Sequence, residues 1–126
     1  MMIDPNGGRP IYIQIAEWIE TEILNDNFKA DDKVYSQYQL AEMFTINPAT
    51  AAKGLNVLTD EHILYGKRGL GKFVTTEAKA IITDKRKNEK LKGLLTEGAL
   101  EAKRLQVGEG ELIEMLQQAI TDVKGD

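Results

Sequence analysis

The chain has 126 residues, of which 42% are hydrophobic and 29% charged, and its formal net charge at pH 7 is -4. This length and balance are typical of one compact domain, or of a small domain with an added helical element, and they exclude a large enzyme. The chain has no cysteine and a single histidine, His62, which excludes disulfides, thiol nucleophiles and zinc sites built from cysteine or clustered histidine.

The N-terminal segment has none of the features of a secretory signal. Residues 1–6 lack both the basic stretch and the apolar stretch of a signal peptide. Apolar runs elsewhere are only a few residues long, which is too short to cross a bilayer. We therefore expect a cytoplasmic protein without a membrane partner.

The first expected element is an amphipathic helix over residues 10–25. Its apolar residues repeat at the spacing of one helix face, with isoleucine at positions 11, 15, 19 and 23. Pro10 suits the first turn, where its missing N–H is not needed. The turn-forming residues 25–27 end this helix, and residues 28–33 are expected to form a loop.

Two short helices should follow, separated by a connection of four residues, 45–48. Ser36 begins the first of them, because Ser36 and Gln39 have the spacing of a capping box. Asn47 is the expected N-cap of the second, which should run over residues 48–61 with proline at its first position. His62 then suits a helix exit with positive φ, a structural role that we favour over a chemical one.

A β-hairpin with a basic tip is expected next. Two β-prone runs, 63–65 and 72–75, flank the glycine-rich segment 66–71. The hairpin contains no acidic residue and three cations, Lys67, Arg68 and Lys72. A local basic patch of this kind can face a nucleic acid even when the whole chain is acidic.

The rest of the chain is expected to be helical. Helix formers dominate from residue 77 to 105, Gly108-Glu109-Gly110 interrupts them, and residues 111–123 form a final amphipathic helix. Two helices have too few layers to bury all their apolar side chains, so we favour a second copy of the chain over an intramolecular core. The residues expected at this homodimer interface are Leu91, Leu94, Leu95, Leu105, Leu112, Ile113, Leu116 and Ile120.

This order of elements predicts a mainly α fold with a small β-hairpin wing. A winged helix-turn-helix over residues 1–76 precedes a two-helix dimerisation element over residues 77–126. In such a fold the second of the paired helices enters the major groove of double-stranded DNA, and its first turn points at base edges. The wing lies along the backbone or in the minor groove, where cationic side chains gain most.

Several short motifs in this order resemble the GntR family of bacterial regulators over residues 10–74. They are Pro10-Ile11-Tyr12-x-Gln14-Ile15, Ser36-x-x-x-Leu40-Ala41, Thr50 to Leu58, and Gly69-x-Gly71-x-Phe73-Val74. The segment Asn47-Pro48-Ala49-Thr50 is similar to the YtrA subfamily, whose C-terminal part is a short two-helix dimerisation element. Residues 101–105 and 111–116 resemble that element, so the resemblance extends over nearly the whole chain.

The resemblance implies a DNA-binding transcription regulator, a repressor that acts as a homodimer on a two-fold operator without a cofactor. By analogy it also implies control of genes for an ABC transporter. The positions at which the family meets DNA are Ser36, Tyr38, Pro48, Thr50, Lys53, Arg68, Gly69 and Gly71. We add Lys67 and Lys72 because of their charge, and Ala49 and Asn56 because of their place on the second paired helix.

The chain departs from the family at Tyr38 and Pro48, where an arginine is common. Phosphate binding must then depend on the wing, helix N-termini, Tyr38 itself and doubling in the dimer, so we expect modest affinity for an isolated half-site. The alternative function is a protein-interaction adaptor that has lost its DNA-binding face. For single residues the alternatives are local packing of the Tyr38 ring, simple exposure of Thr50 and Lys53, and a wing tip without a partner.

We expect neither catalytic nor metal-binding residues. The paired carboxylates Asp31-Asp32 and Asp60-Glu61 stand at turns or helix ends, without a nucleophile, a second histidine or a phosphate-binding loop nearby, so an enzyme is not predicted. The sequence identifies no small-molecule effector, and the fifty residues after position 76 are too few to build a dedicated cavity for one.

Overall fold

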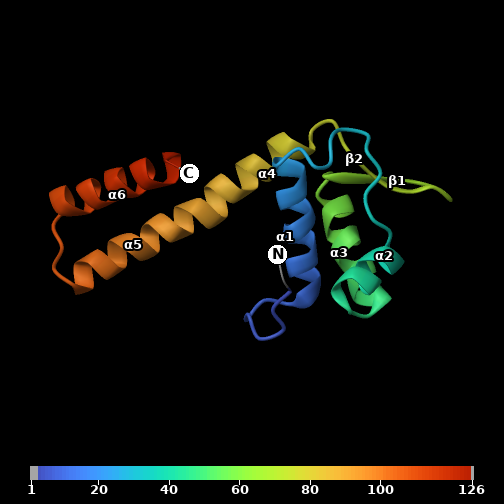
Figure 1. Cartoon of the computed structure of the whole chain (residues 1–126), viewed down its shortest axis with the longest axis horizontal. Coiled ribbons are helices and arrows are strands. Elements are labelled where there is room, and N and C mark those ends of the chain that lie inside the picture. Colours follow the sequence, from blue (N-terminus) through green and yellow to red (C-terminus); the bar gives the residue numbers. More distant parts are fainter. Residues whose placement is uncertain (1–2, 126) are drawn as a thin grey trace. The chain divides into compact units, whose positions relative to one another are not determined.

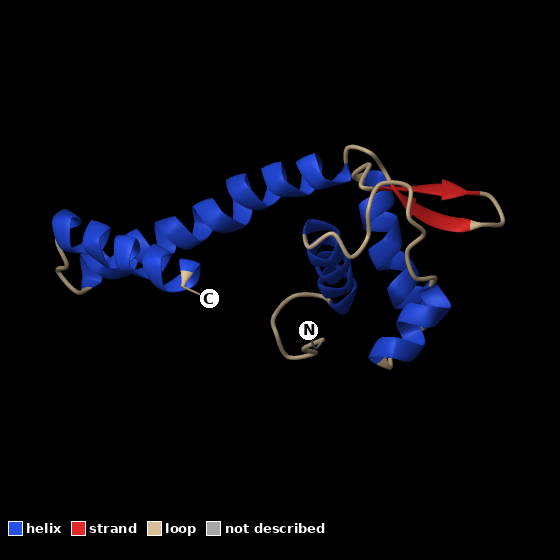
Figure 2. Cartoon of the chain, turned by 45° about the horizontal axis from the view of Figure 1, so that its top comes forward, coloured by secondary structure: helices blue, strands red, loops and turns tan. Residues whose placement is uncertain are grey.

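The computed structural model describes residues 3–125, and Met1, Met2 and Asp126 lie outside the described residues. The chain divides into two compact units, residues 1–84 and 85–126. Helices and one antiparallel hairpin make up the fold (Figures 1 and 2), which confirms the predicted class. The elements are α1 (Ile11–Leu24), α2 (Gln37–Phe44), α3 (Pro48–Asp60), β1 (Leu64–Lys67), β2 (Gly71–Val74), α4 (Ala78–Arg86), the π-helical turn η1 (Lys87–Leu91), α5 (Lys92–Arg104) and α6 (Glu109–Lys124).

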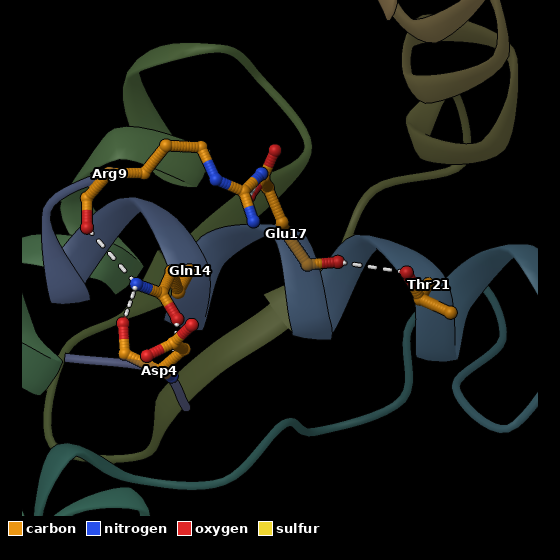
Figure 3. A network of polar contacts seen from close by, with 5 residues as sticks. All are labelled: Asp4, Arg9, Gln14, Glu17 and Thr21. Atoms are coloured by element: carbon orange, nitrogen blue, oxygen red, sulfur yellow. Dashed lines mark hydrogen bonds and ion pairs between the residues drawn. The ribbon is translucent and has the colours of Figure 1, made fainter. Parts of the chain in front are cut away.

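A buried glutamine fixes the entry of the chain into α1 (Figure 3). The Gln14 side chain is only 5% exposed. Its Nε2 donates to the carbonyls of Asp4 (2.7 Å) and Arg9 (3.0 Å), and its Oε1 accepts from the Asp4 N–H (2.8 Å). The side chain of Arg9 also pairs with Glu17. Because these bonds satisfy the buried amide, the segment before the helix is held against α1.

Helices α2 and α3 begin at the predicted caps. The Ser36 hydroxyl accepts from the Gln39 N–H (3.1 Å), and the Gln39 side chain accepts from the Ser36 N–H (2.8 Å), which completes the capping box. Asn47 caps α3 by accepting from the Ala49 N–H (2.7 Å), and Pro48 occupies the first turn. These local bonds confirm both starts.

Helix α3 ends at the predicted left-handed residue. His62 has a φ of 62°. Its N–H donates to the Thr59 carbonyl (3.1 Å), and the Ile63 N–H donates to the Leu58 carbonyl (2.9 Å), the bond pattern of a Schellman motif. The chain therefore turns directly from α3 into the wing.

Helices α1 and α3 pack closely enough to require a glycine. A methyl group at Gly54 would lie 2.8 Å from the Tyr12 carbonyl oxygen and 3.1 Å from Ile15 Cγ2. Around this contact the first unit forms one apolar core, built by Ile15, Ala16, Ile19, Ile23, Val34, Leu40, Ala51, Leu55, Leu58, Ile63, Leu64, Val74, Ala78 and Ile82. Every element of the first unit contributes to it, so the core sets their mutual positions.

The wing differs from the prediction in two ways. The paired strands extend into the glycine-rich segment as far as Lys67 and Gly71, and the Leu70 N–H closes the turn on the Lys67 carbonyl (2.9 Å). Glycine makes this extension possible, because Gly69 and Gly71 have positive φ. In addition, the segment around Lys33, expected to be a loop, bridges to Phe73 in β2.

The C-terminal helices follow the predicted order with shifted bounds. Ala78 and Ile82 of α4 belong to the core of the first unit, which therefore extends beyond residue 76. Helix α6 begins at Glu109 instead of residue 111, because Gly108 adopts an extended cap and places Gly110 inside the first turn. Two glutamates in that turn, Glu109 and Glu111, favour the helix start electrostatically.

Among residues 3–125, no helix combines the length and apolar character that a bilayer crossing requires.

We predict that Gly54→Ala destabilises the first unit by about 1–3 kcal/mol, because the added methyl group must displace the backbone of α1. The measurement is urea unfolding followed by the fluorescence of Trp18, the only tryptophan. Gly93→Ala is the matched control, since a methyl group there meets nothing within 4 Å. Equal unfolding midpoints for Gly54→Ala and the unaltered protein would contradict the prediction.

Candidate nucleic-acid interface

A groove of about 370 Å³ lies between the start of α2, one side of α3 and the wing. It brings together residues that are more than thirty positions apart in the sequence. Eight of the twelve predicted DNA-binding residues line it, namely Ser36, Tyr38, Asn56, Lys67, Arg68, Gly69, Gly71 and Lys72. The geometry thus joins the helix start, the second paired helix and the basic wing in one surface.

The other four predicted residues lie on α3 outside the groove. Pro48 and Ala49 are exposed in the first turn, and Thr50 beside them is half-buried. Lys53 is exposed, and its ammonium lies 4.1 Å from the centre of the Tyr12 ring on α1. The first turn of α3 therefore leaves Pro48 and Ala49 at the surface.

Two of the three wing cations, Lys67 and Lys72, lie against its aromatic rings or its backbone. Lys67 Nζ lies 4.5 Å from the centre of the Phe73 ring and 5.8 Å from that of Tyr65, and the two rings stack with centres 5.7 Å apart. Lys72 lies along Gly66, where a methyl group would be 3.4 Å from its Nζ. Cation–π contacts of this kind restrict a lysine while its charge stays at the surface.

A tyrosine joins the wing to the segment that precedes α2. Tyr65 Oη donates to Asp31 Oδ1 (2.7 Å), across 34 positions of sequence. This hydrogen bond, with burial and the charge of Asp31, raises the pKa of the Tyr65 phenol. The position of the wing therefore depends on a side-chain contact as well as on strand pairing.

Sequence reasoning missed some residues of the groove. Gln37, Ala52, Leu55 and Gly66 also line it. Ala52 lies four residues before Asn56, so helical spacing alone could have indicated it. Gly66 pairs with Lys72, and Leu55 is a buried core residue, so only the strand register and the packing identify these two.

A short helix pair with a capped turn, followed by a basic hairpin that flanks the second helix, defines a winged helix-turn-helix protein. No protein-family model matches the sequence. The transcriptional repressor YtrA of Bacillus subtilis is 30% identical over 128 residues, which cover 99% of this chain and 95% of the relative. The chain belongs to the GntR family of transcriptional regulators and to its YtrA subfamily, as the motifs predicted.

Solved structures agree with this assignment. A GntR family transcriptional regulator from Listeria monocytogenes matches with a TM-score of 0.73 and 30% identity, covering 90% of this chain and 97% of that one. The DNA-binding domain of AraR, in complex with its operator ORX1, matches with a TM-score of 0.54 and 26% identity over 60% of this chain and 93% of that one. The relatives are regulators, and this chain is a regulator and not an enzyme.

We predict that Asp31→Asn lowers the pKa of Tyr65 toward its ordinary value, because the mutation removes the charged acceptor. Asparagine suits the position, where φ is 68°. In the unaltered protein, the raised pKa means that the neutral Tyr65 phenol contributes to the free energy of unfolding. This contribution is present below the unfolded pKa of about 10 and is lost as the pH rises through the higher folded pKa. Titration of phenolate absorbance measures the change, with Tyr65→Phe to identify the signal. An unchanged titration in Asp31→Asn would refute the assigned cause.

Proposed function

We propose that this regulator is a repressor that binds duplex DNA through the groove residues, with α3 in the major groove and the wing on the backbone or in the minor groove. The convergence of the capped start of α2, the polar side of α3 and the basic wing on one groove carries this proposal. The AraR domain of similar fold was solved on an operator, which supports it. An operator-bound repressor would exclude polymerase from the promoter.

The exposure of the groove side chains supports direct DNA contact. Tyr38 is 69% exposed, so local packing leaves its hydroxyl free to meet a phosphate. Lys67 and Arg68 are exposed at the wing tip. Since the formal charge of the whole chain is -4, these local cations must supply much of the attraction to phosphate.

The proposal is tested by fluorescence anisotropy at several salt concentrations. The DNA is a fragment from upstream of the protein's own gene, compared with an unrelated fragment of equal length. We expect tight, salt-sensitive binding to the first fragment and much weaker binding to the second. The triple variant with alanine at Lys67, Arg68 and Lys72 should lose affinity for both fragments, because it removes phosphate contacts.

A matched variant tests whether the loss of affinity is specific to the cations of the wing or follows from removing three positive charges anywhere in the chain. Alanine at Lys90, Lys92 and Lys124 removes the same charge from the second unit and should leave DNA affinity nearly unchanged. If the wing variant retained DNA at low salt as well as the unaltered protein does, the adaptor function would replace the proposed one.

We infer that the second unit forms the homodimer. Among its described residues only Ala102 is buried, and α6 has no buried residue. Of the eight predicted interface residues, Leu112 is half-buried and the other seven are between 47% and 65% exposed. Apolar side chains concentrated on two helices at this exposure favour burial against an identical surface of a second copy.

A homodimer would present two α3 helices to one operator. Two-fold symmetry then requires half-sites about one helical turn of DNA apart, roughly 34 Å, or a multiple of this distance. We also propose that residues 1–76 bind DNA, that the part of residues 77–126 beyond α4 carries dimerisation, since Ala78 and Ile82 of α4 belong to the first core, and that the protein acts in the cytoplasm. Control of an ABC transporter operon is proposed from the likeness to the YtrA subfamily alone.

We predict that Leu116→Glu converts a dimer into a monomer, because it places a charge in the proposed apolar interface. Sedimentation analysis measures the change. The control Gln118→Glu adds the same charge on the opposite side of α6 and should leave the dimer intact. The monomeric variant should bind the full operator far more weakly, consistent with modest affinity for one half-site. A Leu116→Glu variant that remains dimeric would contradict the proposed interface.

A further inference from the structure

We propose that Lys33 is a further DNA-phosphate contact and that it forms, with Lys67, a cationic outer face of the wing. This inference rests on the proposed DNA-binding function. Lys33 lies before α2, in a segment that the sequence indicates to be a loop, and it does not border the groove described above. Its role follows from strand pairing and not from any local motif.

Lys33 is part of the wing because its segment pairs with β2. The residue forms an antiparallel bridge with Phe73. On either side, the Val34 N–H donates to the Lys72 carbonyl (3.0 Å) and the Val74 N–H donates to the Asp32 carbonyl (3.0 Å). The wing therefore contains three paired segments, with β2 in the middle, and Lys33 belongs to one edge.

Strand alternation places Lys33 on the same face as Lys67. Directly paired residues of an antiparallel sheet point to the same side, and so do residues two apart in one strand. Phe73 pairs with both Lys33 and Tyr65, and Lys67 follows Tyr65 by two positions. The buried Leu64 and Val74 belong to the other face, so the two lysines share the face opposite these core residues.

The side chain of Lys33 extends toward the wing tip along Gly71. A methyl group on Gly71 would lie 3.0 Å from Lys33 Cε and 3.8 Å from its Nζ, so the glycine leaves room for this side chain. Gly71 is also the strand partner of Lys67. Lys33 and Lys67 are both exposed, and both adjoin Gly71, Lys33 through its side chain and Lys67 through strand pairing.

The charges on this face suit an anion with the properties of a DNA phosphate. Asp31 and Asp32 precede Lys33; the carboxylate of Asp31 accepts the Tyr65 hydroxyl (2.7 Å) and that of Asp32 accepts the Lys29 N–H (2.8 Å). The stacked Tyr65 and Phe73 rings lie beneath Lys67 and restrict its motion. Two exposed cations on one face attract a phosphate more strongly than either does alone. Contact with the backbone predicts an effect that does not depend on base sequence.

The test compares Lys33→Ala, Lys33→Arg and the unaltered full chain on the upstream fragment and on the unrelated fragment. For each, log K is measured against log salt concentration. Loss of one phosphate contact should reduce the steepness of this dependence by about 0.9 per protomer, and weaken binding to both fragments in the same proportion. Lys33→Arg keeps the charge and should retain the steepness of the unaltered protein.

Lys29→Ala is the matched control, because Lys29 is an exposed lysine of the same connecting segment but borders the pocket beside Thr75 and Lys79, at the end of β2 away from the wing tip. It should leave the salt dependence unchanged. Circular dichroism should show equal helix content for all variants, since Lys33 pairs through its backbone. If the unaltered protein binds and Lys33→Ala has the same salt dependence, the inference is overturned while the proposed function stands. If the unaltered protein binds neither fragment at low salt, both are overturned.

Discussion

The close approach of α1 and α3 at Gly54 is the contact on which the rest of the first unit depends. The carbonyl of Tyr12 and the side chain of Ile15 leave space for a hydrogen and for nothing larger. With one side of α3 pressed against α1, the opposite side of the same helix faces the groove. The left-handed exit at His62 then leads directly into the wing, whose buried Leu64 and Val74 join the core that α1 began. A single backbone contact thereby helps to set where the groove lies.

The positive charge that this regulator can present to DNA is concentrated in the wing. The chain as a whole is acidic, and only three cations and no acid occur in the hairpin. Folding adds Lys33 to that group through a strand bridge and places Lys67 over two aromatic rings. Because interactions between exposed charges fade within about 10 Å at 0.1 M salt, such a cluster matters more to a nearby phosphate than the net charge does. The acidic remainder would disfavour non-specific adsorption to DNA.

The two units differ in how much of their apolar surface they bury. The first encloses a core of its own, whereas the second leaves most of its large apolar side chains exposed. Such a second unit would gain stability from the proposed homodimer, which would couple that gain to DNA binding. Each protomer would bring one groove, and the departures at Tyr38 and Pro48 from the family's common arginines would make the pairing of half-sites more important. Because the DNA contacts of one protomer would be weak and the dimer would double them, the affinity for DNA would depend on whether the protein is dimeric.

The sequence by itself determined those features that depend on neighbours along the chain. The capping box at Ser36, the Asn47-Pro48 start and the left-handed exit at His62 were all predicted, because caps use backbone groups within a few residues. The glycine-rich tip predicted the hairpin, and motif order predicted the family. Only the tertiary structure decided that Lys33 joins the wing, that Lys53 lies over Tyr12, and that Leu55 borders the groove. These contacts join residues far apart in sequence, and neither periodicity nor local turn chemistry carries information about which distant segments the shared core brings together.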